Sequence, residues 1–144
     1  MQIVNLREQE LMSNFEGHHV AFPVSSATGN AATATVYMEF EPGAELPEHR
    51  DSAEELLLVL EGTVEAYVDG ETTILREGDL AVVPAMAPHG TRNVSDKRAR
   101  LIGFFGGSTN VATFTEAQGP EAWRVFVVGA PVPMAAPLEE PALV

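Results

Sequence analysis

The sequence predicts an all-β fold, a single small barrel. Short runs of apolar and β-branched residues alternate with turn residues, and no long helical period competes with them. The chain has 144 residues, of which 45% are hydrophobic, and this suits one domain with a sizeable core. There is room for one barrel of this kind and not for two.

The expected strands can be located by their composition and their turns. Alternating small and β-branched residues indicate a strand at 31–41, and the unbroken large aliphatic residues 56–60 indicate a strand that is covered on both faces. The clearest hairpin joins 64–68 to 72–75, because the pair Asp69-Gly70 suits the positive φ angles of a tight turn. Further strands are expected at 80–83, 99–105 and 123–128.

The two ends of the chain differ from this barrel. Residues 5–15 mix Leu, Met and Phe with polar residues, which indicates a short helix or an irregular arm. Four prolines between Pro131 and Pro141 exclude a central strand there. We therefore expect an N-terminal arm at 1–16, the barrel at 17–128, and a Pro/Ala-rich tail at 129–144 that is either mobile or lies over a neighbouring subunit.

Charge and composition exclude several classes of protein. Eight basic and 21 acidic residues give a net charge of −13, which would repel the phosphate backbone of nucleic acid. No apolar run is long enough to cross a bilayer, and the N-terminus lacks the pattern of a secretory signal. We therefore expect a cytoplasmic protein that binds neither nucleic acid nor membrane. Because the chain has no cysteine, any metal ion has to be held by imidazole and carboxylate groups.

Four residues with metal-binding side chains fall in the middle of the chain. His49 and Asp51 lie two apart on an extended segment, so both point to one face while Arg50 points away. Glu55 opens the next strand after a short turn. His89 follows a later strand and its turn residues, so it can return on a neighbouring strand toward the other three.

The spacing of these residues resembles the two motifs of the cupin superfamily. The first motif is matched by Gly43, His49, Asp51, Glu55 and Gly62, and the second by Gly78, Pro84, His89 and Asn93. The fifteen residues between the motifs suit a small single-domain cupin, whose fold is a jelly-roll β-barrel. We expect the glycines to serve the backbone at turns, where positive φ angles are needed.

Two positions depart from that resemblance. Asp51 stands where the family usually has a second histidine, and Met86 stands where it commonly has glycine near a tight turn. The thioether of Met86 either lines the mouth of a pocket or packs in the ordinary way.

The chemistry of the side chains supports a metal site. Two neutral imidazoles and one carboxylate form a facial set that leaves open positions on Fe(II) or a similar ion, and His49, Glu55 and His89 supply such a set. Asp51 is then a fourth ligand, a catalytic group that reaches the ion through water and transfers protons, or a turn-capping residue away from the ion. The expected cofactor is a divalent ion, and Fe(II), Mn(II) and Zn(II) are not distinguished.

Side chains outside the motifs can also reach the pocket. His18 and His19 are adjacent on a strand, so at most one points inward, and surface placement is expected for the pair. The following aromatic residues either wall a cavity or form plain core: Tyr37, Phe40, Phe104, Phe105 and Trp123.

The resemblance to small cupins implies a metal-dependent enzyme that acts on a small organic molecule in the barrel. We expect a dioxygenase-type reaction, because three protein ligands leave room on the ion for both substrate and oxygen. Two alternatives remain open: a non-catalytic binding or sensing protein, and a metal-free sugar isomerase or epimerase in which His49 and Asp51 form an acid–base couple. Since an open sheet edge is a liability, we also expect a homodimer.

Overall fold

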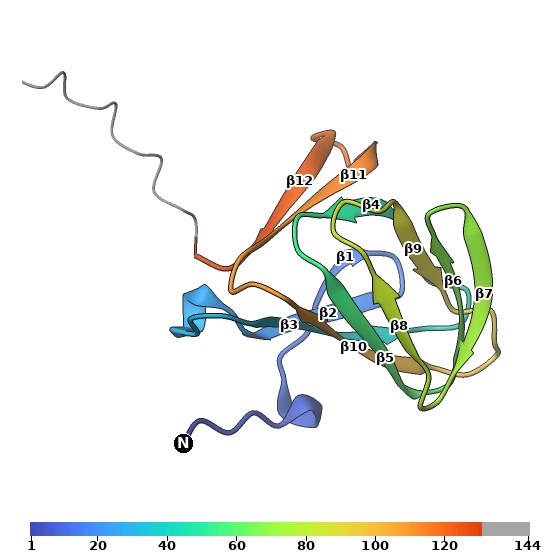
Figure 1. The fold of residues 1–144 in the computed structure, drawn as a ribbon. Coiled ribbons are helices and arrows are strands. Elements are labelled where there is room, and N and C mark those ends of the chain that lie inside the picture. Colours follow the sequence, from blue (N-terminus) through green and yellow to red (C-terminus); the bar gives the residue numbers. More distant parts are fainter. Residues whose placement is uncertain (131–144) are drawn as a thin grey trace, which may run out of the picture.

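The computed structural model describes residues 1–130, which form two six-stranded sheets (Figure 1). The first sheet contains, in spatial order, β1 (Met12–Phe15), β2 (His18–Val24), β3 (Ala34–Phe40), β10 (Ala99–Phe105), β5 (Glu55–Glu61) and β8 (Leu80–Val83). The second contains β12 (Trp123–Val128), β11 (Asn110–Gln118), β4 (Glu45–Asp51), β9 (His89–Arg92), β6 (Thr63–Val68) and β7 (Glu71–Arg76). All pairings described between these strands are antiparallel, and the sheets form the jelly-roll barrel that the sequence predicts.

Helical structure in the described residues is limited to two 3₁₀ turns, η1 (Leu6–Glu8) and η2 (Ser26–Thr28). Within residues 1–130, no helix has the length and the hydropathy needed to span a bilayer.

The hydrophobic core lies between the two sheets, because each strand turns alternate side chains inward. On β3, Met38 and Phe40 are 2% and 0% exposed, and on β5 the same inward face carries Leu57 and Val59. Burial on β5 alternates between buried and half-buried residues, so its outer face is only partly covered. The second sheet contributes Val64 and Ala66 of β6, among others, to this core cluster.

Several predicted elements are confirmed. The strands expected at 99–105 and 123–128 are β10 and β12, with the same bounds. The expected hairpin is formed by β6 and β7, and its turn residues Asp69 and Gly70 have φ angles of 47° and 87°. Two positive φ angles in succession are what a type I′ turn requires, which explains why an Asp-Gly pair stands there.

Two strands were not predicted. β1 forms inside the segment that was expected to be a short helix or an irregular arm, and it pairs with β2 at the edge of the first sheet. β11 lies between β12 and β4 in the second sheet. The proline-rich tail expected at 129–144 lies, from residue 131 onward, outside the described residues.

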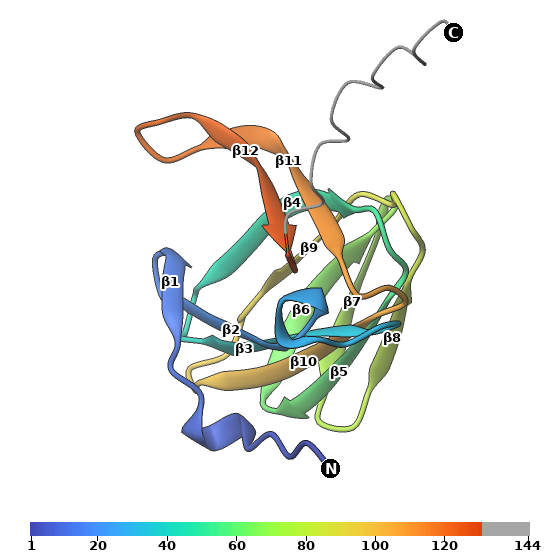
Figure 2. The ribbon, with the colours of Figure 1, turned by 90° about the vertical axis from the view of Figure 1, so that its left-hand side faces the viewer.

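β1 and the hairpin of β11 and β12 come together at one end of the barrel (Figure 2). The ring of Phe15 on β1 lies 5.4 Å from the ring of Phe114 on β11 and 5.9 Å from that of Trp123 on β12, measured between centroids. The two unpredicted strands thus supply Phe15 and Phe114 to an aromatic cluster, and β12 adds Trp123.

Candidate metal centre

Strand register brings the two sequence motifs together inside the barrel. In the pairing of β4 with β9, His49 lies directly opposite His89, and in the pairing of β4 with β11, Asp51 lies opposite Ala112. His49 and Asp51 are 5% and 3% exposed, whereas Arg50 between them is exposed. The alternation predicted for this strand is therefore confirmed, as is the return of His89 on a neighbouring strand.

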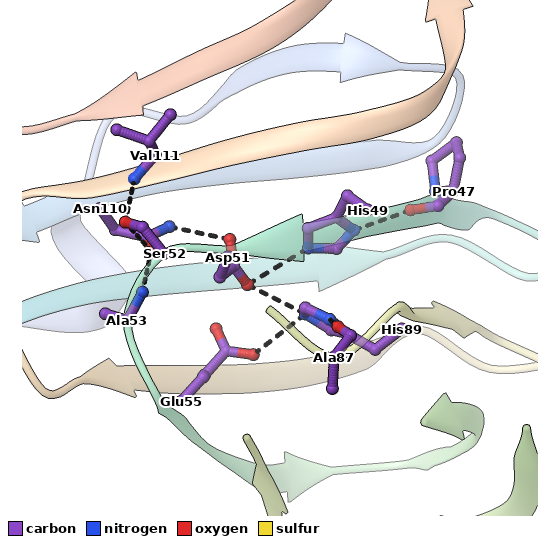
Figure 3. A network of polar contacts seen from close by, with 10 residues as sticks. All are labelled: Pro47, His49, Asp51, Ser52, Ala53, Glu55, Ala87, His89, Asn110 and Val111. Atoms are coloured by element: carbon purple, nitrogen blue, oxygen red, sulfur yellow. Dashed lines mark hydrogen bonds and ion pairs between the residues drawn. The ribbon is translucent and has the colours of Figure 1, made fainter. Parts of the chain in front are cut away.

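Backbone carbonyl groups fix the orientation of both imidazole rings. Nδ1 of His49 lies 2.8 Å from the carbonyl oxygen of Pro47, and Nδ1 of His89 lies 2.9 Å from that of Ala87. Because a carbonyl can only accept, each Nδ1 donates its proton, and each neutral ring keeps the lone pair on Nε2. Both Nε2 atoms face the carboxylate of Asp51 (Figure 3).

The carboxylate of Asp51 is held on its other side by Asn110. The side-chain amide of Asn110, at the start of β11, donates to Oδ1 at 2.8 Å and leaves Oδ2 facing the imidazoles. Burial alone would raise the pKa of Asp51, but the neighbouring imidazoles of His49 and His89, which donate to this carboxylate when they are protonated, outweigh burial. They hold the pKa of this carboxyl well below its usual range, so Asp51 is ionised.

The centre has a place for a positive charge. Within residues 1–130, the buried atoms Oδ2 of Asp51 and Nε2 of His89 lack a hydrogen-bond partner, although they lie 2.9 Å apart. A lone pair that faces a carboxylate oxygen at this distance is repelled unless a cation lies between them. That cation is either a proton on the ring or a metal ion. Burial lowers the pKa of His89, but Asp51 outweighs burial and raises it, which favours the proton when no metal is bound.

The separations between the donor atoms suit a metal ion. Ligand atoms about 2.1 Å from one ion lie about 3.0 Å apart at a right angle and about 3.4 Å apart at the tetrahedral angle. Oδ2 of Asp51 lies 2.9 Å from Nε2 of His89 and 3.5 Å from Nε2 of His49. The donor atoms of all three residues lie within 4.8 Å of one another. The distances from Oδ2 of Asp51 to the two imidazoles therefore suit a divalent ion held by His49, Asp51 and His89.

Glu55 lies beside this group of three and not within it. Its Oε1 is 3.9 Å from Nε2 of His89, and its other oxygen packs against Gly103 of β10, where a Cβ atom would collide with it. Burial, together with the charge of Asp51, raises the pKa of Glu55 to about 8, although His89 opposes this shift. The sequence argument took Glu55 as one of three primary ligands and left the role of Asp51 open. In the structure, Asp51 lies closer to His89 than Glu55 does.

An apolar cavity of about 60 Å³ lies next to the centre. His49, Asp51 and Glu55 line it, and so do Phe105 and Trp123 of the aromatic residues singled out in the sequence. Further aromatic walls come from Phe15, Phe22, Phe114 and Phe126. The ring of Phe114 stacks on that of His49 at a centroid distance of 5.0 Å.

His18 lines this cavity and Met86 does not. His18 is 2% exposed and lines the cavity, so surface placement of the pair His18 and His19 was wrong for His18. Strand alternation did allow one of the two to point inward. Met86 has a φ angle of 65°, the left-handed conformation that glycine adopts more easily, but its side chain is 52% exposed and does not line the cavity.

Sequence reasoning missed Asn110 and Phe114. Both come from β11, which was not predicted, and both point inward from it. A signal was present: Asn110, Ala112 and Phe114 alternate with the β-branched residues Val111, Thr113 and Thr115, which is the period of a half-buried strand.

Comparison with known proteins agrees with this fold and these motifs. Residues 36–105 match the family model for the cupin domain. The chain therefore contains a small cupin-type domain.

One relative by sequence and two by structure illustrate the similarity. A stretch of 62 residues is 39% identical to the polyketide synthase CurC of Streptomyces cyaneus and covers 42% of this chain and 40% of that protein, so less than half of that relative is matched. The polyketide cyclase RemF from Streptomyces resistomycificus has a TM-score of 0.64 and 18% identity, over 73% of this chain and 78% of that one. Oxalate decarboxylase from Bacillus subtilis has a TM-score of 0.64 and 25% identity, over 72% of this chain and 28% of that one.

Asn110→Ala tests the role of the amide that holds Asp51. We expect the variant to bind Zn(II) or Mn(II) about 10- to 100-fold more weakly, because the carboxylate is no longer oriented. We also expect it to lose about 1–3 kcal/mol of stability, because Oδ1 of Asp51 stays buried without a donor. Metal titration by calorimetry and urea unfolding measure the two effects.

Asn93→Ala is the matched control for Asn110→Ala. Asn93 is also fully buried, but its amide donates to the carbonyl groups of Phe40 and Lys97, away from the centre. This control should lose stability and keep its affinity for the ion. An unchanged metal affinity in Asn110→Ala would contradict the role given to Asn110.

The raised pKa of Glu55 predicts how the stability of the metal-free protein depends on pH. The folded protein holds this proton up to a pKa of about 8, against 4.5 for the ordinary group. The proton on Glu55 therefore contributes fully to the free energy of unfolding below the pKa of the unfolded state. This contribution is lost as pH rises through the pKa of the folded state, at about 1.4 kcal/mol per pH unit at most. His89, whose pKa is also raised, contributes with the same sign.

Urea unfolding in the presence of a chelator, at several pH values from about 5 to about 8, measures this dependence. Glu55→Gln should have a clearly smaller loss of stability over this range than the unchanged protein. Glu54→Gln, at the neighbouring exposed position, should leave the slope as it is. Equal slopes in all three proteins would show that Glu55 is ionised throughout.

Proposed function

We propose that the chain is a metal-dependent cupin enzyme that acts on a small aromatic molecule in the barrel cavity. The observation that carries this proposal is the pair of buried, unpartnered atoms among the described residues, Oδ2 of Asp51 and Nε2 of His89. A cation would stabilise these two atoms, and they lie next to a cavity with aromatic walls. A concave, mainly apolar site with a few convergent polar groups is the usual form of a small-molecule site.

In this proposal His49, Asp51 and His89 hold the ion, and Glu55 is close enough to join them after a small movement of its side chain. The ion is Fe(II), Mn(II) or Zn(II), all of which accept imidazole and carboxylate ligands. When bound, such an ion supplies Lewis acidity and, in the case of Fe(II), a place where dioxygen is activated.

A dioxygenase-type reaction is the first candidate, and it is supported by the number of close donors. Three protein donors leave positions for both a substrate oxygen and dioxygen. The aromatic walls would orient a planar ring and exclude water. Asp51, fixed by Asn110, keeps one oxygen toward the ion, while the carboxyl group of Glu55 is available to hold or release a proton at the edge of the cavity.

Ring closure of a polyketide-type molecule is the second candidate. It is favoured by the 39% identity with the polyketide synthase CurC over 62 residues, and the polyketide cyclase RemF has the same fold. In such a reaction Glu55, in its ionised form, would take a proton from a carbon next to a carbonyl group. This reaction needs no dioxygen, so the two candidates can be separated by experiment.

A sugar isomerase is less well supported than either candidate. A sugar brings many hydroxyl groups, whereas the cavity wall is mainly aromatic and aliphatic. If Asp51 works without metal, its closest partner is His89 at 2.9 Å, not His49 at 3.5 Å as the sequence argument assumed.

Metal analysis of protein purified without a nickel column or a chelator tests the proposal. We expect close to one divalent ion per chain, and loss of that ion in the double variant His49→Ala, His89→Ala, because two of the three nearest donors are removed. Elemental analysis by mass spectrometry gives both numbers. Metal absent from the unchanged protein, and not taken up from Fe(II), Mn(II) or Zn(II) solutions, would favour a binding protein or metal-free chemistry.

The metal-loaded protein also separates the two reactions. A dioxygenase should consume dioxygen when a hydroxylated aromatic acid is added, and conversion should stop without air. A cyclase should convert a linear poly-β-ketone at the same rate with and without air.

We also propose that the chain forms a homodimer through the outer face of the first sheet. β8 is an edge strand, and its residues Leu80 and Val82 are 54% and 56% exposed. Val82 is in register with Leu56 of β5, which is in register with Phe104 of β10, 41% exposed. These side chains form an apolar row across three strands, and a second copy would cover both the row and the open edge.

Val82→Asp should convert a dimer into a monomer, because a buried unpaired carboxylate is costly at an apolar interface. Light scattering at micromolar concentration should give twice the mass of one chain for the unchanged protein and the mass of one chain for the variant. Val125→Asp, on β12 and equally exposed at 55%, should remain dimeric. A monomeric unchanged protein would exclude the proposed dimer.

A further inference from the structure

His18 is a buried histidine that the proposed metal centre does not use. It lies on β2 and is 2% exposed, with its ring centroid 4.7 Å from that of Phe40 and 5.9 Å from that of Phe15. The adjacent His19 points to the other face of the strand, where its ring forms a hydrogen bond with Ser13. His18 is therefore the member of the pair that reaches the cavity.

Both ring nitrogens of His18 are buried and unpaired among the described residues. Neither Nδ1 nor Nε2 has a hydrogen-bond partner in the part of the chain that the structure describes. Burial, followed by the charges of His19 and His49, lowers the pKa of His18 to about 4, so the ring is neutral near pH 7. A neutral imidazole offers one donor and one acceptor, and leaving both unpaired in an apolar setting is unfavourable.

The surroundings of His18 are aromatic. Phe15, Phe114 and Trp123 form a group of three rings with centroid distances of 5.4 to 5.9 Å, and Phe15 also contacts His18. Such walls favour a planar apolar ligand, and His18 is a polar group set among them. Asp51 and His49 line the same cavity.

We propose that His18 anchors a hydroxyl group of a planar aromatic ligand, a phenol or an enol, inside the cavity. A hydroxyl group both donates and accepts, so it can pair with either nitrogen of a neutral imidazole. A carboxylate can only accept a hydrogen bond, so it suits only the protonated nitrogen, and an unsubstituted ring would leave both nitrogens unpaired. This inference rests on the proposed function, because it takes the cavity to be the substrate site. It adds the class of substrate and a residue that selects it.

Two single-ring probes of nearly equal shape test the anchor: phenol and toluene. Trp123 is the single tryptophan of the chain and lines the cavity, so its indole N–H signal in a proton–nitrogen NMR spectrum reports binding of either probe. The titrations are made with a chelator present, so that they do not depend on whether the protein holds a metal ion.

We expect the unchanged protein to bind phenol more tightly than toluene. His18→Phe keeps an aromatic ring at this position and should bind phenol about three- to tenfold more weakly, as the loss of one hydrogen bond requires. Its affinity for toluene should stay the same. Phe22→Leu, which alters an apolar wall of the cavity, should weaken both probes alike. Equal effects of His18→Phe on the two probes, no effect on either, or no binding of phenol to the unchanged protein would overturn the proposal.

A second measurement needs no variant and covers the case in which His18→Phe fails to fold. Phenol, and not toluene, should shift the ring-nitrogen signals of His18 in long-range proton–nitrogen spectra of the unchanged protein. Nitrogen signals that do not respond to saturating phenol would contradict the anchor. Because both readouts are made without metal, they stay informative if the metal proposal fails.

Discussion

The buried carboxylate of Asp51 is the interaction on which the rest of the centre depends. It is ionised, 3% exposed, and held between one amide and two imidazoles that come from three adjacent strands of one sheet. An isolated charge in such a place would be very unfavourable. The register of β4 with β9 and β11 is therefore tied to the chemistry of the site, because a shift by one residue would turn His49 and Asp51 out of the barrel.

The same carboxylate explains why the centre favours a cation. The backbone carbonyl groups of Pro47 and Ala87 take the Nδ1 protons of the two histidines, which leaves two lone pairs directed at Asp51. A proton on one ring removes the repulsion between that ring and Asp51, and a divalent ion removes the repulsion for both rings. The low polarity of the neighbouring aromatic walls strengthens the electrostatic attraction inside the site. An ion bound here would therefore stabilise the folded barrel.

Much of the fold was predictable from the sequence, because local patterns and packing agree there. The hairpin at Asp69-Gly70, the strand at 99–105 and the common direction of His49 and Asp51 each follow from one short stretch. β1 was missed because it is a short edge strand of mixed composition that is fixed by pairing with β2. The alternation of inward-facing and β-branched residues in β11 was recognisable but did not lead to a predicted strand. Asn110 and Phe114 were therefore not predicted as site residues.

The candidate site was predictable as a set of residues but not in its internal geometry. Spacing selected the four side chains, but it could not say that Asp51 lies 2.9 Å from His89 while Glu55 lies 3.9 Å from the same ring. That difference depends on Asn110 and Gly103, which come from strands far away in the sequence. Likewise, alternation allowed one of His18 and His19 to point inward, and only the pairing of β2 with β3 decides which one.

The position of a bound ion tests the central claim most directly. A crystal of the protein loaded with Mn(II) or Zn(II), measured at wavelengths on both sides of the metal's absorption edge, locates the ion by its anomalous scattering. The account predicts one ion about 2.0–2.2 Å from Nε2 of His49, Nε2 of His89 and Oδ2 of Asp51. A fully loaded crystal in which the ion lies elsewhere, and in which His89 remains in direct hydrogen-bond contact with Asp51, would contradict it.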